Sequence, residues 1–90
     1  MGEDLNRQVI VITGAGSGMG RASAIEMARQ GGRVVVTDVN RKGGEDTAAA
    51  IVTEGHEAIY IHCDLRSSDA IKALMDKTVA HFGGIDVLHN

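Results

Sequence analysis

Four short apolar runs recur along the chain and predict β-strands. Val9–Ile12 and Val34–Val36 are unbroken and rich in β-branched residues, and Ala58–Ile61 and Ile85–Leu88 follow them. Unbroken apolar runs are typical of strands that are covered on both faces, as in parallel sheets. We therefore expect a parallel sheet at the centre of the fold.

Three stretches between these runs have the spacing of amphipathic helices, and glycine follows each of them. The first covers residues 19–30, and the second surrounds Ile51. The third begins behind an N-cap at Ser67 or Ser68 and ends at Phe82. The positions expected to face the sheet are Ala22, Ile25, Ala28, Ala48, Ile51, Val52, Ile71, Leu74, Met75, Thr78 and Phe82.

The element order β-α-β-α-β-α-β predicts an α/β protein with a parallel sheet and helices on both faces, which makes three layers. We expect residues 1–90 to be the N-terminal part of one incomplete domain, the first half of a doubly wound fold. Half a fold leaves the fourth strand as an uncovered edge. We therefore expect side chains of Val9–Ile12 and Val87–Leu88 to meet water, and the isolated chain to fold poorly.

Composition narrows the function classes. The formal net charge is −3, aromatic residues make up 2% of the chain and no basic cluster is present, so nucleic-acid binding is not expected. No apolar run has membrane-spanning length and the N-terminus is polar and acidic, so neither a membrane span nor a signal peptide is expected. Cys63 is the single cysteine and cannot form an internal disulfide, which fits the cytoplasm.

The segment between the first strand and the first helix, Thr13–Gly20, has glycine at every second position from Gly14 onward. Glycine permits backbone conformations closed to other residues and lets an anion approach the N–H groups at a helix N-terminus. The P-loop pattern fails because no Gly-Lys pair follows, and G-x-G-x-x-G fails because position 19 is Met19. The loop nevertheless predicts a phosphate site.

The spacing that is present, T-G-x-x-x-G-x-G from Thr13, resembles the nucleotide fingerprint of short-chain dehydrogenases/reductases. The resemblance implies a Rossmann-like fold with the strands in the order third, second, first, fourth. Met19 departs from the isoleucine usual in that family. The residues that would contact the pyrophosphate of a nicotinamide dinucleotide are Gly14, Gly16, Ser17, Gly18, Met19 and Gly20.

Asp38 ends the second predicted strand, 18 residues after Gly20. A carboxylate at this place in the family accepts hydrogen bonds from both ribose hydroxyls of NAD and repels the extra phosphate of NADP. No basic residue follows Asp38 directly, and the nearest candidate is Arg41. The resemblance therefore implies NAD(H) as the cofactor, with NADP(H) less favoured. The alternative is that Asp38 only caps the next loop.

Two later segments extend the resemblance. Asp64-Leu65 resembles the family's Asp-Val pair, in which the carboxylate meets the adenine amino group and the neighbouring backbone meets the ring. The alternative role of Asp64 is to order the turn ahead of the next helix. Asn90 matches the first residue of the family's Asn-Asn-Ala-Gly, while His89 departs from the aliphatic residue usual before it. Asp64, Leu65 and Asn90 are therefore further candidate cofactor contacts.

No catalytic residue is predicted in this chain. Family members use a tyrosine as acid/base, a lysine four residues later and a serine that positions the substrate oxygen. The single tyrosine, Tyr60, is followed four residues later by Asp64 instead. No metal site is predicted either, because the four histidines and Cys63 lack the pairing of metal ligands.

The sequence as a whole predicts the NAD(H)-binding segment of an oxidoreductase that interconverts an alcohol and a carbonyl by hydride transfer. The small-molecule substrate would bind the full-length protein, which the resemblance implies is a homo-oligomer, and residues 1–90 alone would be inactive. One alternative is a nucleotide-binding module without catalysis. Another is half of an S-adenosylmethionine-dependent methyltransferase, which is disfavoured because Thr13 stands where that class carries an acidic residue.

Overall fold

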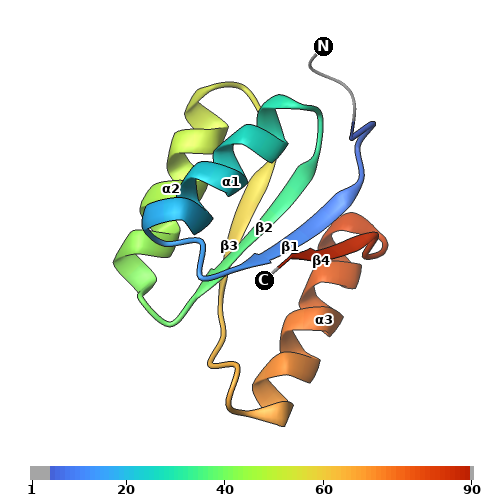
Figure 1. Ribbon diagram of the computed structural model, residues 1–90. Coiled ribbons are helices and arrows are strands. Elements are labelled where there is room, and N and C mark those ends of the chain that lie inside the picture. Colours follow the sequence, from blue (N-terminus) through green and yellow to red (C-terminus); the bar gives the residue numbers. More distant parts are fainter. Residues whose placement is uncertain (1–4, 90) are drawn as a thin grey trace.

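The computed structural model describes residues 5–89 and shows strands and helices in strict alternation (Figure 1). The chain therefore has the α/β architecture that the apolar runs predict. The elements are β1 (Val9–Thr13), α1 (Gly18–Arg29), β2 (Arg33–Asp38), α2 (Arg41–Thr53), β3 (Ala58–His62), α3 (Ser68–Phe82) and β4 (Val87–His89).

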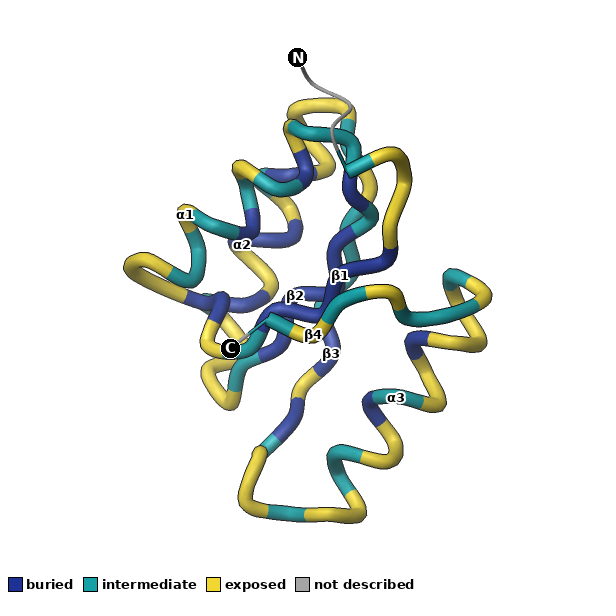
Figure 2. Tube along the Cα trace, turned by 45° about the vertical axis from the view of Figure 1, so that its right-hand side comes forward, coloured by how far each residue is buried: buried dark blue, intermediate teal, exposed yellow. Residues whose placement is uncertain are grey.

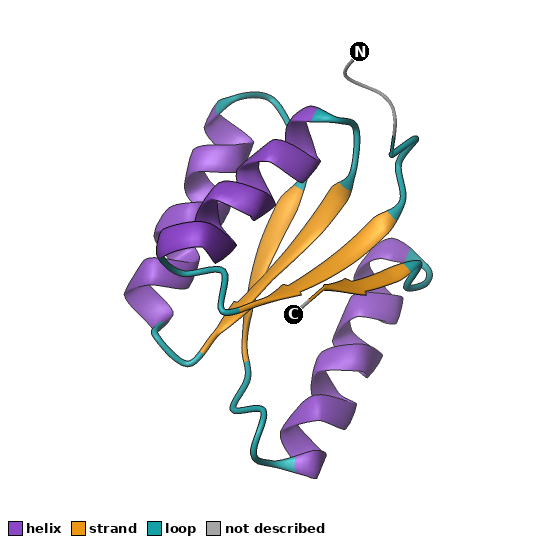
Figure 3. Ribbon diagram, viewed as in Figure 1, coloured by secondary structure: helices purple, strands orange, loops and turns teal. Residues whose placement is uncertain are grey.

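The four strands form one parallel sheet in the order β3-β2-β1-β4, which confirms the predicted order. Helices α1 and α2 cover one face and α3 covers the other, so the fold has three layers (Figure 3). All strands point the same way, and the carboxyl ends of β1, β2 and β3 therefore meet at one edge of the sheet. This Rossmann-like arrangement brings the glycine-rich loop and the two strand-end acidic residues to that edge.

The core consists of two apolar clusters, one on each face of the sheet. Buried residues run along the strands and recur on the helices that flank them (Figure 2). Alternate residues of a strand point to opposite faces, so Ile10 and Ile12 pack toward α1 and α2 while Val11 packs toward α3. Ile51 and Leu74 close the two clusters from α2 and α3. Because helices cover both faces, the strands need continuous rather than alternating apolar sequence.

Two positions expected on buried helix faces lie elsewhere. Ala24 and Ala28 are the buried positions of α1, whereas Ala22 is exposed. On α2 the buried residues include Ala48 and Ile51, whereas Val52 is 54% exposed. Ala24 and Ala28 are small and lie one helical turn apart, which lets α1 lie close to the sheet. The spacing of three residues used in the sequence analysis did not identify this buried face.

The expectation of an exposed first strand was wrong. All residues of Val9–Ile12 are buried within the described chain, and only Leu88 in β4 is half exposed. The fourth strand also begins two residues later than the apolar run suggests. Asp86 lies just before β4 and is bonded to the start of β1. Its N–H donates to the Val9 carbonyl at 2.9 Å, and its Oδ2 accepts the Val9 N–H at 2.8 Å.

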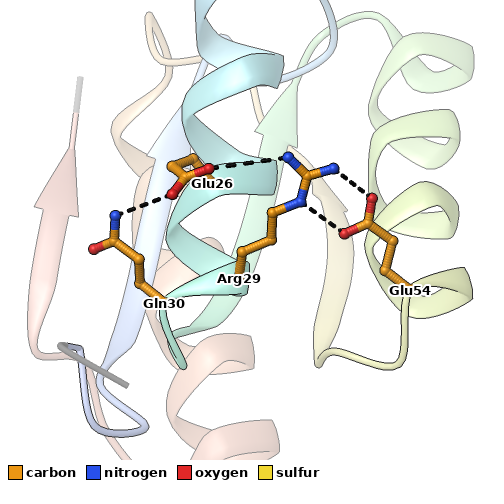
Figure 4. Close-up of polar contacts among 4 residues, drawn as sticks. All are labelled: Glu26, Arg29, Gln30 and Glu54. Atoms are coloured by element: carbon orange, nitrogen blue, oxygen red, sulfur yellow. Dashed lines mark hydrogen bonds and ion pairs between the residues drawn. The ribbon is translucent and has the colours of Figure 1, made fainter. Parts of the chain in front are cut away.

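The carboxyl-terminal ends of α1 and α2 are joined by an ion pair (Figure 4). Arg29 donates from Nε and Nη2 to the two carboxylate oxygens of Glu54 at 2.9 and 2.7 Å. These hydrogen bonds lower the pKa of Glu54 and raise that of Arg29. Both side chains are largely exposed, so the pair adds little to stability. No helix within residues 5–89 has the length and apolar character needed to cross a membrane.

Replacing Leu74 tests the α3 side of the core. Leu74 is 1% exposed, so Leu74→Ala should lower the unfolding free energy of the protein by about 2–5 kcal/mol through lost burial and a cavity. Leu74→Met conserves volume and should cost about 1.5 kcal/mol or less. Denaturant melts measure both, and equal effects of the two variants would contradict the packing described for α3.

Candidate functional site

The glycine-rich loop links β1 to α1 and depends on left-handed backbone. Gly14 has φ +64° and Gly18 has φ +57°, a region that residues with a Cβ rarely adopt. The Ala15 N–H donates to the Thr37 carbonyl at 3.2 Å, which ties the loop to the end of β2. The loop therefore lies across the carboxyl edge of the sheet.

Close approach explains the other two glycines. A Cβ at Gly20 would overlap the Gly14 carbonyl, so α1 can begin directly above the loop only with glycine there. A Cβ at Gly16 would lie 2.8 Å from Asp38 Oδ2. On the far side, a Cβ at Gly43 of α2 would lie 2.6 Å from the Gly16 carbonyl oxygen. The start of α2 thus packs against the loop, a contact that the sequence pattern does not reveal.

The amino end of α1 faces the loop without a side-chain cap. Ser17 is the N-cap, and its side chain makes no capping hydrogen bond. N–H groups in a first helical turn have no partner within the helix and carry the positive end of its dipole. Met19, in this turn, is 87% exposed, so its side chain takes no part in the core. The arrangement suits an anion held by backbone N–H groups.

Asp38 ends β2 and reaches the glycine loop. Its Oδ2 accepts the Gly16 N–H and its Oδ1 accepts the Asn40 N–H, each at 2.9 Å. It therefore does cap the next loop, as the alternative interpretation holds. A carboxylate offers about four acceptor positions, so the two oxygens can accept further hydrogen bonds from a ligand.

Asp64 follows β3 and is held by Arg66. The guanidinium donates to Asp64 from Nε and Nη2 at 3.0 and 2.8 Å, and the Arg66 N–H donates to Oδ1 at 2.9 Å. These contacts lower the pKa of Asp64 to about 2. Asp64 therefore orders the turn and also carries a negative charge at neutral pH. Sequence reasoning missed Arg66, although its place two residues after Asp64 is the available signal.

A cavity of about 300 Å³ opens between the ends of β1, β2 and β3. Val39 and Leu65 line it and are 58% and 48% exposed, which leaves apolar surface for a flat ring. Thr37 also lines it, and the Thr37 hydroxyl is buried without a hydrogen-bond partner in the described structure. The residues that line the cavity are Thr13, Gly14, Thr37, Asp38, Val39, Cys63, Asp64, Leu65 and Arg66.

The predicted site residues within the described range come together at this edge. Gly14, Asp38, Asp64 and Leu65 line the cavity, and the rest of the loop adjoins it. Asn90 lies outside the described residues. Two larger hollows, of about 340 and 440 Å³, lie at the amino edge of the sheet and beside α1 and β4. Neither is lined by the glycine loop or a strand-end carboxylate.

Fold and loop together define a Rossmann-like α/β protein with a glycine-rich first turn. Residues 8–90 match the short chain dehydrogenase family. The chain belongs to the short-chain dehydrogenase/reductase family, whose members bind nicotinamide dinucleotides. This membership favours the dehydrogenase interpretation over the methyltransferase alternative.

Individual relatives are dehydrogenases. The chain is 43% identical over 88 residues to cis-4-hydroxycyclohexanecarboxylate dehydrogenase from Sinomonas cyclohexanicum, covering 98% of this chain and 35% of the relative. It is 39% identical to 2,5-dichloro-2,5-cyclohexadiene-1,4-diol dehydrogenase from Sphingobium indicum, covering 97% and 34%. The solved structure of hydroxysteroid dehydrogenase from Escherichia coli superposes with a TM-score of 0.88 at 34% identity, covering 90% and 34%. The chain thus spans about a third of the length of these proteins.

The Asp64–Arg66 contact predicts a pH-dependent contribution to the stability of the folded protein. The folded pKa is lowered to about 2 from an ordinary value of 3.8, so the stabilisation is present above pH 3.8 and is lost as the pH falls through about 2. In Arg66→Ala the pKa should rise toward 3.8 but stay below it, because the backbone N–H of residue 66 remains.

Carbon-13 NMR titration of the Asp64 carboxyl measures this directly. Arg66→Lys serves as the control, since it keeps a positive charge without the bidentate geometry. It should give an Asp64 pKa between those of the unmodified protein and Arg66→Ala. An Asp64 pKa that Arg66→Ala leaves unchanged would refute the contact.

Proposed function

We propose that this chain is the N-terminal, cofactor-binding part of a single NAD(H)-dependent domain that interconverts an alcohol and a carbonyl. The observation that carries the proposal is the hydrogen bond between the Gly16 N–H and the Asp38 carboxylate. It supports the proposal because Asp38, which would bind the ribose, lies beside a loop that would hold the adjoining phosphates, as dinucleotide recognition requires.

The pyrophosphate would lie over the amino end of α1. Backbone N–H groups there replace its water, and the left-handed glycines keep side chains out of its path. The apolar surface of Val39 and Leu65 would sandwich the adenine, whose amino group would donate to the ionised Asp64. The residues assigned to the cofactor are Gly14, Gly16, Ser17, Gly18, Met19, Gly20, Asp38, Asp64, Leu65 and Asn90.

The bound nicotinamide would supply the hydride chemistry, and this chain would bind and orient the cofactor. Tyr60 does not fit the acid/base role, because its hydroxyl donates to the Asp38 carbonyl and Asp64 stands four residues later in place of lysine. We assign proton transfer and substrate binding to the rest of a longer protein, consistent with the chain covering about a third of its relatives. Residues 1–90 alone are then inactive, and the substrate is a small alcohol or carbonyl compound.

Cofactor preference tests the role of Asp38. The full-length protein should show a higher kcat/KM with NAD(H) than with NADP(H), because the carboxylate excludes the 2′-phosphate. Asp38→Ala combined with Val39→Arg should move the ratio toward NADP(H) by about tenfold or more, equivalent to about 1.4 kcal/mol.

Asp46→Ala is a matched control for this experiment. It removes a carboxylate of α2 that pairs with Lys42 at 3.1 Å and does not line the cavity. Steady-state kinetics with both cofactors should show no change of ratio in this variant. Equal or better efficiency of the unmodified protein with NADP(H) would refute NAD(H) preference.

The loop itself is tested by Gly18→Val. A branched side chain is strained at φ +57° and would point into space that the phosphates need, so NADH binding should be lost. Fluorescence titration with NADH measures the affinity. Gly84→Val is the control, because Gly84 has open space and no left-handed backbone. Unchanged affinity in a folded Gly18→Val variant would show that the loop does not hold the phosphates.

A further inference from the structure

We infer that Tyr60, packed against Gly44, is a positioning residue that holds Asp38 for the ribose and thereby sets the preference for NAD(H) over NADP(H). The inference rests on the proposed function and deepens it. It assigns a role to the single tyrosine, which the hydride chemistry does not use.

Tyr60 reaches the main chain of Asp38 from the neighbouring strand. It lies in β3 beside Val36 of β2, and its hydroxyl donates to the Asp38 carbonyl at 2.6 Å. Burial raises the pKa of the Tyr60 hydroxyl, which therefore keeps its proton at neutral pH. This hydrogen bond lies at the last residue of β2, in the short connection that leads to the start of α2 at Arg41.

Asp38 is consequently held at three atoms. Its two carboxylate oxygens accept the Gly16 and Asn40 N–H groups, and its carbonyl accepts the Tyr60 hydroxyl. The first two bonds orient the side chain, whereas the Tyr60 bond fixes the backbone from which that side chain extends. Binding groups need support of this kind to stay within about 0.5 Å of a productive position.

Gly44 makes room for the ring. A Cβ at Gly44 would overlap the Tyr60 ring, so α2 can lie this close to β3 only with glycine at that position. Gly43, the preceding residue, approaches the Gly16 carbonyl in the same way. Gly43 and Gly44 thus allow the start of α2 to pack closely against both the glycine-rich loop and Tyr60.

The Tyr60 ring also lies beside Arg41, the basic residue nearest to Asp38 in the sequence. The Arg41 guanidinium lies 5.9 Å from the centre of the Tyr60 ring, and its Nη1 lies 3.9 Å from a Glu45 carboxylate oxygen. A cation over an aromatic face is attracted to it. Without the ring, Arg41 would be released only three residues from Asp38, where it would favour a 2′-phosphate. Loosening of Asp38 and release of Arg41 act in the same direction.

Kinetics of Tyr60→Phe in the full-length protein test the hydroxyl. The ring and its packing stay, so the protein should fold and kcat with saturating NAD should be unchanged. KM for NAD should rise about fivefold, the scale of one hydrogen bond. KM for NADP should not rise, so the ratio of kcat/KM values for NAD and NADP should fall about fivefold.

Thr78→Val is the matched control. It removes a buried hydroxyl that donates to the Leu74 carbonyl at 2.8 Å on α3, and it should lower stability without changing the cofactor ratio. If Tyr60 contributed only to stability, Tyr60→Phe would behave in the same way, and the inference would be overturned.

Gly44→Ala provides a second, independent variant. The added methyl should displace the Tyr60 ring and lower the NAD preference about as much as Tyr60→Phe, whereas Gly44→Ala should have little further effect when combined with Tyr60→Leu. Absence of NADH binding in the unmodified protein overturns the proposed function together with this inference. NAD preference that persists unchanged in folded Tyr60→Phe and Gly44→Ala overturns this inference alone.

Discussion

The close approach between the loop after β1 and the end of β2 is the constraint on which the site depends. Gly16 and Asp38 come close enough for a backbone-to-carboxylate hydrogen bond, and no side chain fits between them. Once these two segments meet, α1 must begin beside the loop and α2 must begin beside Asp38. The absence of a side chain at Gly16 thereby helps to determine where α1 and α2 start.

The sheet supplies the rigidity that this contact needs. β1 lies between β2 and β4 and is buried on both faces, so the glycine loop extends from one of the most constrained strands. Polar groups at the carboxyl edge are less buried than the strands that carry them, and that contrast is what a binding site on an α/β sheet requires. The buried residues of the strands thus contribute to stability, while the carboxyl ends of the same strands carry the polar groups of the candidate site.

Sequence alone predicted the element order from the apolar runs and glycine positions, which are local signals. The strand order and the roles of Asp38 and Asp64 came instead from the resemblance to a known family. Sequence did not predict which face of α1 is buried, the exposure of Met19, or the late start of β4. Those depend on packing between elements.

The hydrogen bonds of Arg66 with Asp64 and of Tyr60 with Asp38 show the same limit. The first joins side chains two residues apart but requires a particular turn, and the second joins residues 22 apart in sequence. Periodicity carries no information about either contact, because each depends on where a turn or a neighbouring strand places the partner. Gly43 and Gly44 are explained in the same way only by tertiary contacts, with the Gly16 carbonyl and the Tyr60 ring.

The reciprocal hydrogen bonds between Val9 and Asp86 have a consequence for biosynthesis. They join residues 77 positions apart, so the edge of β1 that pairs with β4 stays open until the residues up to Asp86 have been made. Ribosomes add about 5–20 residues per second, which exposes this edge for several seconds. The β1–β2–β3 side can assemble during that interval, because its pairings join residues closer in sequence. Protection of the nascent edge by the ribosome or a chaperone would then matter most before residue 86 emerges.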